Sequence, residues 1–236
     1  MSKALAIILA RGGSKGVPGK NTAIVGSRPC IAWTIEHALN TATIGRVIVS
    51  SDDPTALQVA SPMGVEGLRR PSHLATDTAT IDDAARHAHM VTGPHDDTMP
   101  IVILYANVPV RPKDLSQRAL ATLPGCDSVQ SYARVGKHHP WWTVKVSDSG
   151  EISPGEGNVL YHGVYRRQEL PPACVPDGGV IAVTRQALFG EISGVKAGPH
   201  AFFGKVRRGI INNEGDVVDI DTRVDLLVAD AILSGR

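Results

Sequence analysis

The chain has 236 residues and a formal net charge of +1, with 42% hydrophobic and 20% charged residues. These values are ordinary for a globular protein, and they exclude an overall positive field that would attract nucleic acid or an anionic membrane. No apolar run approaches the ~20 residues that a membrane-spanning helix needs. The three cysteines, Cys30, Cys126 and Cys174, match neither a disulfide framework nor a zinc-site spacing. The sequence predicts one cytoplasmic domain over residues 1–236, with neither nucleic acid nor a membrane as a partner.

Buried strands and amphipathic helices alternate through the first half of the chain. Residues 4–10 are all apolar, which is short for a secretory signal peptide and typical of a parallel strand covered on both faces. Residues 50–54, Ser-Ser-Asp-Asp-Pro, are a typical helix start. Further strands are predicted at residues 47–49, 65–68 and 101–105, and helices at residues 31–39, 80–91 and 115–123. This order predicts an α/β fold with a mostly parallel, doubly wound, Rossmann-like sheet that binds ligands at the C-terminal ends of its strands.

Residues 137–172 interrupt the alternation. They contain Trp141, Trp142, Tyr161 and Tyr165 among Gly, Ser and Pro residues, which predicts an inserted hairpin or lobe within the single domain. Strands at residues 180–183 and 217–220 and a last helix at residues 224–233, capped by Asp221 or Thr222, are predicted to complete the fold.

The strongest chemical signal is the loop at residues 10–21, Ala-Arg-Gly-Gly-Ser-Lys-Gly-Val-Pro-Gly-Lys-Asn. Its glycines let backbone N–H groups approach a ligand closely. Arg11, Lys15 and Lys20 place three cations directly after a buried strand, an arrangement suited to a triphosphate. The loop matches neither the Walker A pattern nor the Gly-x-Gly-x-x-Gly dinucleotide pattern, since Ser14 stands where each would need glycine. A flexible, solvated turn is the alternative interpretation.

Two aspartates near the end of the chain, Asp219 and Asp221, are spaced to share a metal ion. On an extended segment residues two apart point the same way, so both carboxylates can hold one Mg²⁺ together with triphosphate oxygens. The alternative is that Asp221 caps the last helix and Asp219 is solvated. Asp216 is close enough in sequence to support the pair. Taken with the basic loop, the spacing predicts Mg²⁺ as the cofactor.

Residues 9–21 closely resemble the signature of the acylneuraminate cytidylyltransferases, or CMP-sialic acid synthetases. The resemblance continues in order over nearly the whole length of the chain, at residues 48–52, 68–80, 167–178 and 219–222. It implies a nucleotidyltransferase that uses CTP and Mg²⁺ to form a CMP-activated nonulosonic, sialic-acid-type sugar with release of pyrophosphate. It also implies an acidic nine-carbon sugar as the second substrate, and a homodimer formed across the active site by the inserted lobe, residues 137–172.

The resemblance assigns roles to individual residues. Arg11 and Lys20 match the principal basic contacts to the CTP phosphates and, with the metal-binding Asp219 and Asp221, form the predicted catalytic set. Asp52, Asp219 and a metal-bound hydroxyl are the candidates for the general base. The predicted nucleotide contacts are Ala10, Arg11, Gly12, Gly13, Lys20, Asn21, Arg70 and Thr80, and the predicted sugar contacts are Tyr105, Asn107 and Arg167.

Several positions depart from the sialic-acid pattern. Tyr105 replaces a sugar-contacting Gln, and its Tyr-Ala-x-x-Pro context is more similar to relatives that act on pseudaminic acid. Trp142 stands where a Lys is frequent, and Val175 stands where a second Arg is found. Fewer cations in the pocket predict a weaker fit to N-acetylneuraminate itself, so the identity of the sugar stays open.

Two other functions remain as alternatives. One is a cytidylyltransferase for another acidic keto sugar such as keto-deoxy-octulosonate, although the Gly-Asp-Glu-Pro strand end typical of those enzymes is absent at residues 105–109. The other is a noncatalytic nucleotide-binding regulatory module on the same fold. The presence of Lys20, Asp219 and Asp221 argues against a module that only binds nucleotide.

Overall fold

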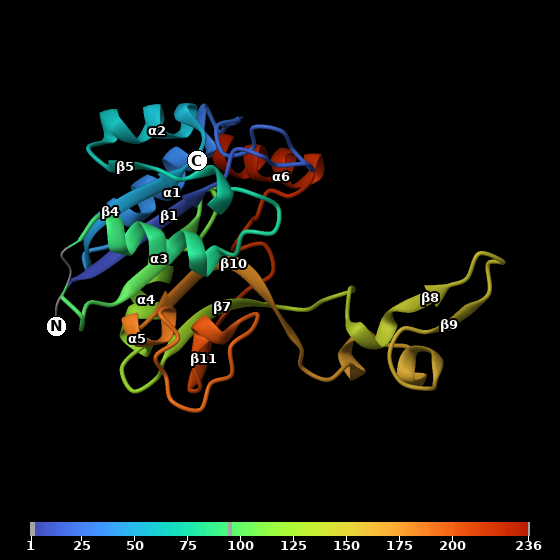
Figure 1. Ribbon diagram of the computed structural model, residues 1–236. Coiled ribbons are helices and arrows are strands. Elements are labelled where there is room, and N and C mark those ends of the chain that lie inside the picture. Colours follow the sequence, from blue (N-terminus) through green and yellow to red (C-terminus); the bar gives the residue numbers. More distant parts are fainter. Residues whose placement is uncertain (1–2, 94–95, 236) are drawn as a thin grey trace.

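The computed structural model describes residues 3–93 and 96–235. Its centre is a seven-stranded sheet in the order β11-β7-β10-β6-β1-β4-β5 (Figure 1). The strands are β1 (Ala4–Ala10), β4 (Ile44–Ser51), β5 (Glu66–Arg69), β6 (Ile101–Tyr105), β7 (Ser128–Arg134), β10 (Cys174–Val183) and β11 (Arg207–Asn212). Neighbouring strands pair parallel except at β10, which runs antiparallel to both β6 and β7. The predicted mostly parallel, doubly wound sheet is confirmed.

Helices cover both faces of the sheet, and the sequence of β1 explains why. Its alternate side chains face two separate apolar clusters, so both faces of the strand are buried. One cluster takes in α1 (Cys30–Leu39), α2 (Pro54–Ala60) and α4 (Leu115–Thr122), and the other takes in α3 (Ile81–Val91) and α5 (Arg185–Leu188). The last helix, α6 (Arg223–Ser234), packs beside the small β2 (Ile24–Val25) and β3 (Arg28–Pro29) hairpin.

The edge of the sheet differs from the prediction. Residues 217–220 do not form a strand, because only the single bridge between Val110 and Val218 pairs this segment. The strands at that side are β7 and β11, which were not predicted. Both carry polar or charged residues. β11, which begins Arg-Arg-Gly, is the edge strand and is only partly buried. β7 pairs with both β10 and β11, and its side chains are partly exposed toward its C-terminal end.

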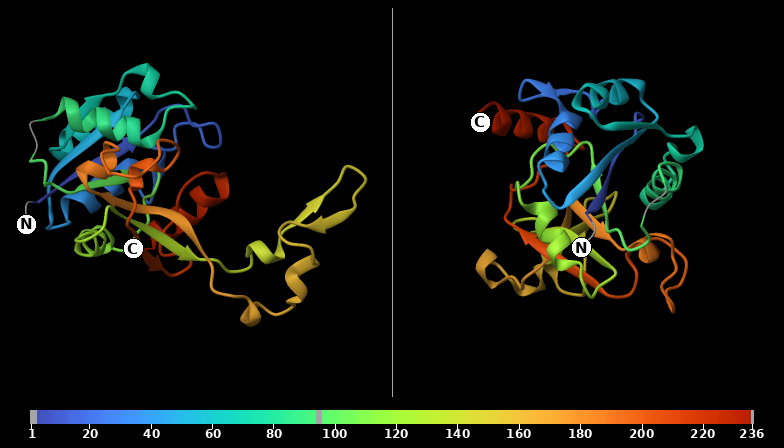
Figure 2. Two further views of the ribbon diagram at one scale, coloured as in Figure 1. Left: turned by 60° about the horizontal axis from the view of Figure 1, so that its bottom comes forward. Right: turned by 90° about the vertical axis from the view of Figure 1, so that its left-hand side faces the viewer.

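Residues 137–172, here called the lobe, extend away from the remaining chain, here called the body (Figures 1 and 2). The lobe contains η3 (Pro140–Trp142), β8 (Val144–Val146), β9 (Ile152–Pro154), η4 (Leu160–Gly163) and η5 (Arg167–Glu169). His139 is its one buried residue, and its ring nitrogen Nε2 contacts the carbonyl oxygen of Pro171 at 3.1 Å. Such a small core gives the lobe little stability of its own. Over the described residues, none of the helices is long and apolar enough to cross a membrane.

Candidate active site

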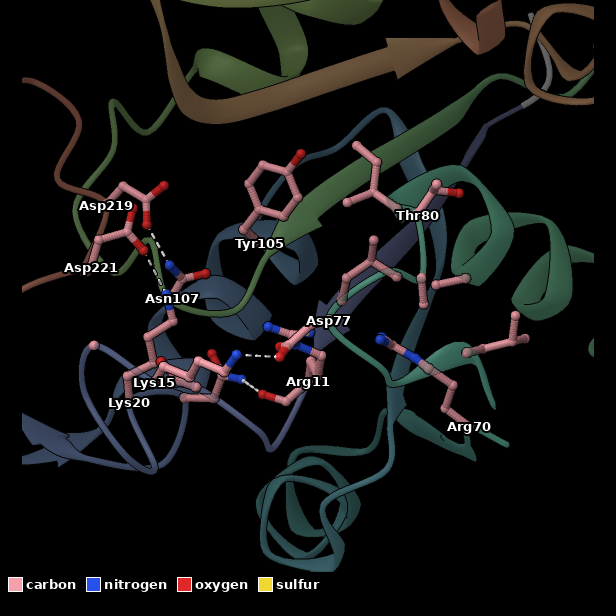
Figure 3. A pocket seen from close by; sticks show the side chains of 18 residues that line it. Arg11, Lys15, Lys20, Arg70, Asp77, Thr80, Tyr105, Asn107, Asp219 and Asp221 are labelled. Carbon is pink, nitrogen blue, oxygen red and sulfur yellow. Dashed lines mark hydrogen bonds and ion pairs between the residues drawn. The ribbon is translucent and has the colours of Figure 1, made fainter. Parts of the chain in front are cut away.

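A cavity of about 490 Å³ lies beside the carboxyl ends of β1, β5 and β6, the side of the sheet where ligands were expected (Figure 3). It brings together side chains from segments far apart in the sequence. Nine predicted site residues line it: Arg11, Lys20, Asn21, Arg70, Thr80, Tyr105, Asn107, Asp219 and Asp221.

The glycine-rich loop is anchored at several points along its length. Asn21 is buried, and its Nδ2 donates to the carbonyl oxygen of Arg11 at 2.7 Å. The backbone N–H of Gly12 donates to Asp52 Oδ1 at 2.9 Å, so Asp52 holds the loop from the end of β4. At Gly16 a Cβ would lie 2.3 Å from the carbonyl oxygen of Asp221, so only glycine lets the loop pass this closely. The loop is therefore a fixed cradle rather than a flexible turn.

Three predicted loop contacts lie outside the cavity lining: Gly12, whose N–H contacts Asp52, and the two residues Ala10 and Gly13. Ala10 is fully buried at the end of β1, where its carbonyl oxygen accepts from Ser51 Oγ at 2.6 Å. Gly13 is exposed, and nothing lies within 4 Å of the position of a Cβ. Their predicted nucleotide contacts could come only from the backbone, and stay predictions.

Each loop cation contacts a carboxylate of the cavity wall. Arg11 Nη1 donates to Asp77 Oδ1 at 3.0 Å and to the carbonyl oxygen of Thr76 at 2.7 Å, and Lys15 Nζ lies 2.6 Å from Asp77 Oδ2. The hydrogen bond and charge of Lys15, with a smaller effect of Arg11, lower the pKa of Asp77. Lys20 Nζ donates to Asp221 Oδ1 at 2.7 Å. Asp77 had no predicted role, since its contacts depend on a loop 62 or more residues away in the chain.

Asp219 and Asp221 lie together at one end of the cavity (Figure 3). Burial, and then the charge of Asp221, raise the pKa of Asp219 to about 6. The helix-cap alternative is wrong, because Thr222 is the N-cap of α6 and forms a capping box with Asp225. Asp219 is not solvated either, since Asn107 Nδ2 donates to its Oδ1. The described residues contain no cluster of three or more His, Cys, Asp or Glu that could hold a metal, so the protein offers these two carboxylates.

The opposite end of the cavity carries Arg70 and Thr80 (Figure 3). Arg70 is buried and donates from Nε to Ser50 Oγ at 3.1 Å and from Nη2 to the carbonyl oxygen of Ser50 at 2.6 Å. Burial lowers its pKa, and the charge of Asp52 opposes that effect. Thr80 is the N-cap of α3, and its hydroxyl accepts from the N–H of Asp83 at 3.2 Å. The cavity lining also includes apolar side chains, those of Leu9, Leu74, Ala79, Ile81 and Ala84.

Tyr105, which lines the cavity, and Gly178 both lie close to Asp219. Burial, and then the charge of Asp219, raise the pKa of Tyr105 to about 12, so its hydroxyl stays protonated at neutral pH. Gly178 has φ +73°, and a Cβ there would lie 2.9 Å from Asp219 Oδ2 and 3.6 Å from Tyr105 Cδ2. It lies in an irregularity of β10 that Asp177 stabilises by accepting from the N–H of Gly179 at 2.9 Å. Gly178 lies in the segment 167–178 that carries the resemblance, but it received no predicted role, because its approach to Asp219 depends on a contact between distant segments.

Arg167 lies apart from the other predicted site residues. It belongs to η5 of the lobe, is exposed, and pairs with Glu214 at 3.1 Å. It does not line the cavity. Its predicted contact with the sugar stays a prediction.

Comparison with known proteins places this geometry in a family. The cytidylyltransferase family model matches residues 5–134. The chain belongs to the cytidylyltransferase family. It is 34% identical over 231 residues to the pseudaminic acid cytidylyltransferase of Campylobacter jejuni serotype O:23/36, covering 95% of this chain and 93% of that one. It is 27% identical over 229 residues to the N-acylneuraminate cytidylyltransferase of Streptococcus agalactiae serotype V, covering 95% of this chain and 52% of that one.

Two further facts define how far this cytidylyltransferase resembles known proteins. The chain spans about half the length of the curated N-acylneuraminate cytidylyltransferases of Streptococcus agalactiae and Escherichia coli that it matches. Among solved structures, it resembles CMP:2-keto-3-deoxy-manno-octonic acid synthetase complexed with CTP, with a TM-score of 0.73, 20% identity and 99% coverage of both chains. At that identity the likeness establishes the nucleotidyltransferase fold alone.

Proposed function

We propose that this cytidylyltransferase joins CMP from CTP to an acidic nine-carbon sugar and releases pyrophosphate. The observation that carries the proposal is the single cavity in which a basic, glycine-rich loop faces the Asp219/Asp221 pair. Similarity to relatives named N-acylneuraminate and pseudaminic acid cytidylyltransferases supports the nonulosonic class of sugar. Tyr105 lines the cavity where the sialic-acid pattern has a Gln, and this difference supports a sugar other than N-acetylneuraminate.

Mg²⁺ is part of the proposal, and the residues present fit it. Asp219 and Asp221 are two carboxylates close enough for the charge of one to raise the pKa of the other, so a divalent cation between them would relieve repulsion. One or two carboxylates completed by phosphate oxygens and water is a common protein environment for Mg²⁺. When bound there, Mg²⁺ would neutralise charge on the triphosphate.

The chain's own residues supply binding and orientation. Lys20 would exchange Asp221 for phosphate oxygens, and Arg11 would turn its remaining N–H groups toward the triphosphate. The anomeric hydroxyl of the sugar then attacks the α-phosphorus and forms the new O–P bond, while the bond from the α-phosphorus to the oxygen that bridges to the β-phosphate breaks. The hydroxyl proton passes to a general base, and Asp219 is the carboxylate candidate for that base that lines the cavity. The cations that face the departing pyrophosphate stabilise the charge that develops on it.

We further propose that the protein is a homodimer formed through the lobe. The lobe exposes large apolar side chains, including Val146, Val159 and Tyr165, whose exposed fraction is 85%. Exposed apolar patches of this kind are typical of protein–protein contacts. A cytoplasmic location belongs to the same proposal, because CTP is a cytoplasmic metabolite.

Pyrophosphate release tests the proposed function directly. Purified protein with Mg²⁺ would be given each of the four nucleoside triphosphates with N-acetylneuraminate, legionaminate, pseudaminate or keto-deoxy-octulosonate. We expect release with CTP and a nine-carbon acid. Release only with keto-deoxy-octulosonate would contradict the sugar class, and no release from protein that binds CTP would contradict the enzyme assignment for this panel.

A further inference from the structure

Arg111 is a buried cation that the proposed chemistry does not use. Its exposed fraction is 5%, and no carboxylate of the described residues lies within ion-pair distance of it. Its Nε has no hydrogen-bond partner. Burial lowers the pKa of Arg111 to about 10, so the side chain is still charged at neutral pH. Because burying an unpaired charge costs several kcal/mol, the position of this side chain calls for an explanation.

The guanidinium holds the turn at residues 105–108, which follows β6. Arg111 Nη2 donates to the carbonyl oxygen of Tyr105 at 3.3 Å, and its Nη1 donates to Thr34 Oγ1 at 3.0 Å. The hydroxyl of Thr34, on α1, in turn donates to the carbonyl oxygen of Val108 at 3.1 Å. The buried side chains of Arg111 and Thr34 therefore hold both ends of the turn, at Tyr105 and at Val108.

The same turn carries Asn107, which reaches the aspartate segment. Asn107 Nδ2 donates to Asp219 Oδ1 and to the carbonyl oxygen of Ile220, the latter at 3.2 Å. The N–H of Ile220 donates back to the carbonyl oxygen of Asn107 at 2.9 Å. Only one orientation of the amide can donate to a carboxylate and a carbonyl together, so the side chain is fixed. Its amide hydrogens are thus used within the protein, and the predicted contact of Asn107 with the sugar stays a prediction.

We propose that Arg111 and Asn107 are positioning residues for the Asp219 carboxylate: Arg111 fixes the turn, and Asn107 on that turn fixes one carboxylate oxygen. The inference rests on the proposed function, in which Asp219 binds the cation of the metal–CTP complex. Supporting groups of this kind typically contribute about 10- to 100-fold to metal affinity or activity. The guanidinium of Arg111 presents N–H groups in a fixed planar arrangement, and two of them contact Thr34 and the Tyr105 carbonyl together.

A double-mutant cycle between N107A and D219N tests the coupling. We expect N107A alone to lower kcat by about 10- to 100-fold, and to lower it less than about threefold further in the D219N background. Calorimetry should show CTP binding without metal within about twofold of the wild type, and Mn²⁺ binding to the protein–CTP complex about tenfold weaker. Independent, multiplicative losses in the two backgrounds, or unchanged Mn²⁺ affinity, would overturn the proposal.

Variants of Arg111 test whether this residue fixes the turn at residues 105–108. R46M is the matched control. Arg46 donates to the carbonyl oxygen of Thr92 at 2.6 Å near the other end of β4, away from the cavity. We expect R111M to weaken Mn²⁺ binding as N107A does, R111K to weaken it less, and R46M to leave it unchanged. If R111M does not fold, R111K and T34V carry the test, and normal Mn²⁺ affinity in both would contradict the role of Arg111. The Mn²⁺ measurements need no sugar, so they are distinguishable from a failure of the proposed transfer reaction.

Discussion

The cavity end of the body and the lobe are stabilised in different ways. In the cavity, side chains from β1, β5, β6 and the segment before α6 each have protein contacts that fix their direction, as with Asn21, Arg70 and Asn107. The lobe has one buried residue, His139, and exposes its larger apolar side chains. The body is therefore preorganised for a small ligand, whereas the lobe offers a surface suited to a second protein.

The largest effect should come from the aspartate pair. D221N should lower kcat by about 10³-fold while CTP affinity measured without metal changes only a few-fold, because a metal ligand acts mainly in the transition state. Steady-state kinetics and calorimetry check this. D216N is the matched control. The position of Asp216 in the sequence suggested that it supports the pair, but it does not line the cavity and instead accepts from the N–H of Asn213 at 2.9 Å. Near-normal turnover of D221N would refute its assignment as a metal ligand.

The next effect separates two lysines of one loop. The side chain of Lys20 is 16% exposed and that of Lys15 is 84% exposed, so Lys20 should be the more effective contact to phosphate. K20M should lower kcat/KM by about 100-fold and K15M by less than about fivefold. Equal losses of kcat/KM for CTP in the two variants would contradict this ranking and the fixed geometry of the glycine-rich loop.

Substitutions in the lobe should weaken dimer formation without changing the stability of the body. Charged substitutions V159D and Y165D in one chain should raise the dimer dissociation constant by roughly 30-fold or more, the cost of about 2 kcal/mol at an interface. The unfolding temperature of the body should stay unchanged. M90D, at an exposed apolar position on α3, is the control. Analytical ultracentrifugation measures the dimer dissociation constant of each variant. A monomeric wild-type protein would rule out the dimer.

The smallest effect tests how closely the cavity wall is packed. G64A and G178A both place alanine at positive φ, +72° and +73°, but only Gly178 has neighbours within 4 Å of the position of a Cβ. Each should lose about 1 kcal/mol of unfolding free energy from backbone strain. G178A should in addition lower kcat by about tenfold, since the methyl group would displace Asp219. Equal kcat values in the two variants would show that Gly178 is not needed for the site.

Local patterns in the sequence explain what could be predicted. The loop at residues 10–21 and the Asp219/Asp221 pair are contiguous motifs, and β1 is recognisable because it is buried on both faces. The strands β7 and β11 were missed because they are partly exposed and polar. Asp77 and Gly178 lie in segments that carry the resemblance, yet neither they nor Arg111 received a predicted role. Their roles arise from contacts between distant segments, which a local pattern does not specify.

³¹P NMR can follow each phosphorus atom of CTP, and so tests whether the protein transfers CMP to a sugar at the α-phosphorus. With Mg²⁺ and an acidic nine-carbon sugar, we predict that the triphosphate signals disappear while pyrophosphate and one phosphodiester signal grow in equal amounts. That result would establish transfer at the α-phosphorus. Formation of CDP and inorganic phosphate, or persistent CTP in the presence of protein that binds it and of every sugar in the panel, would contradict the account.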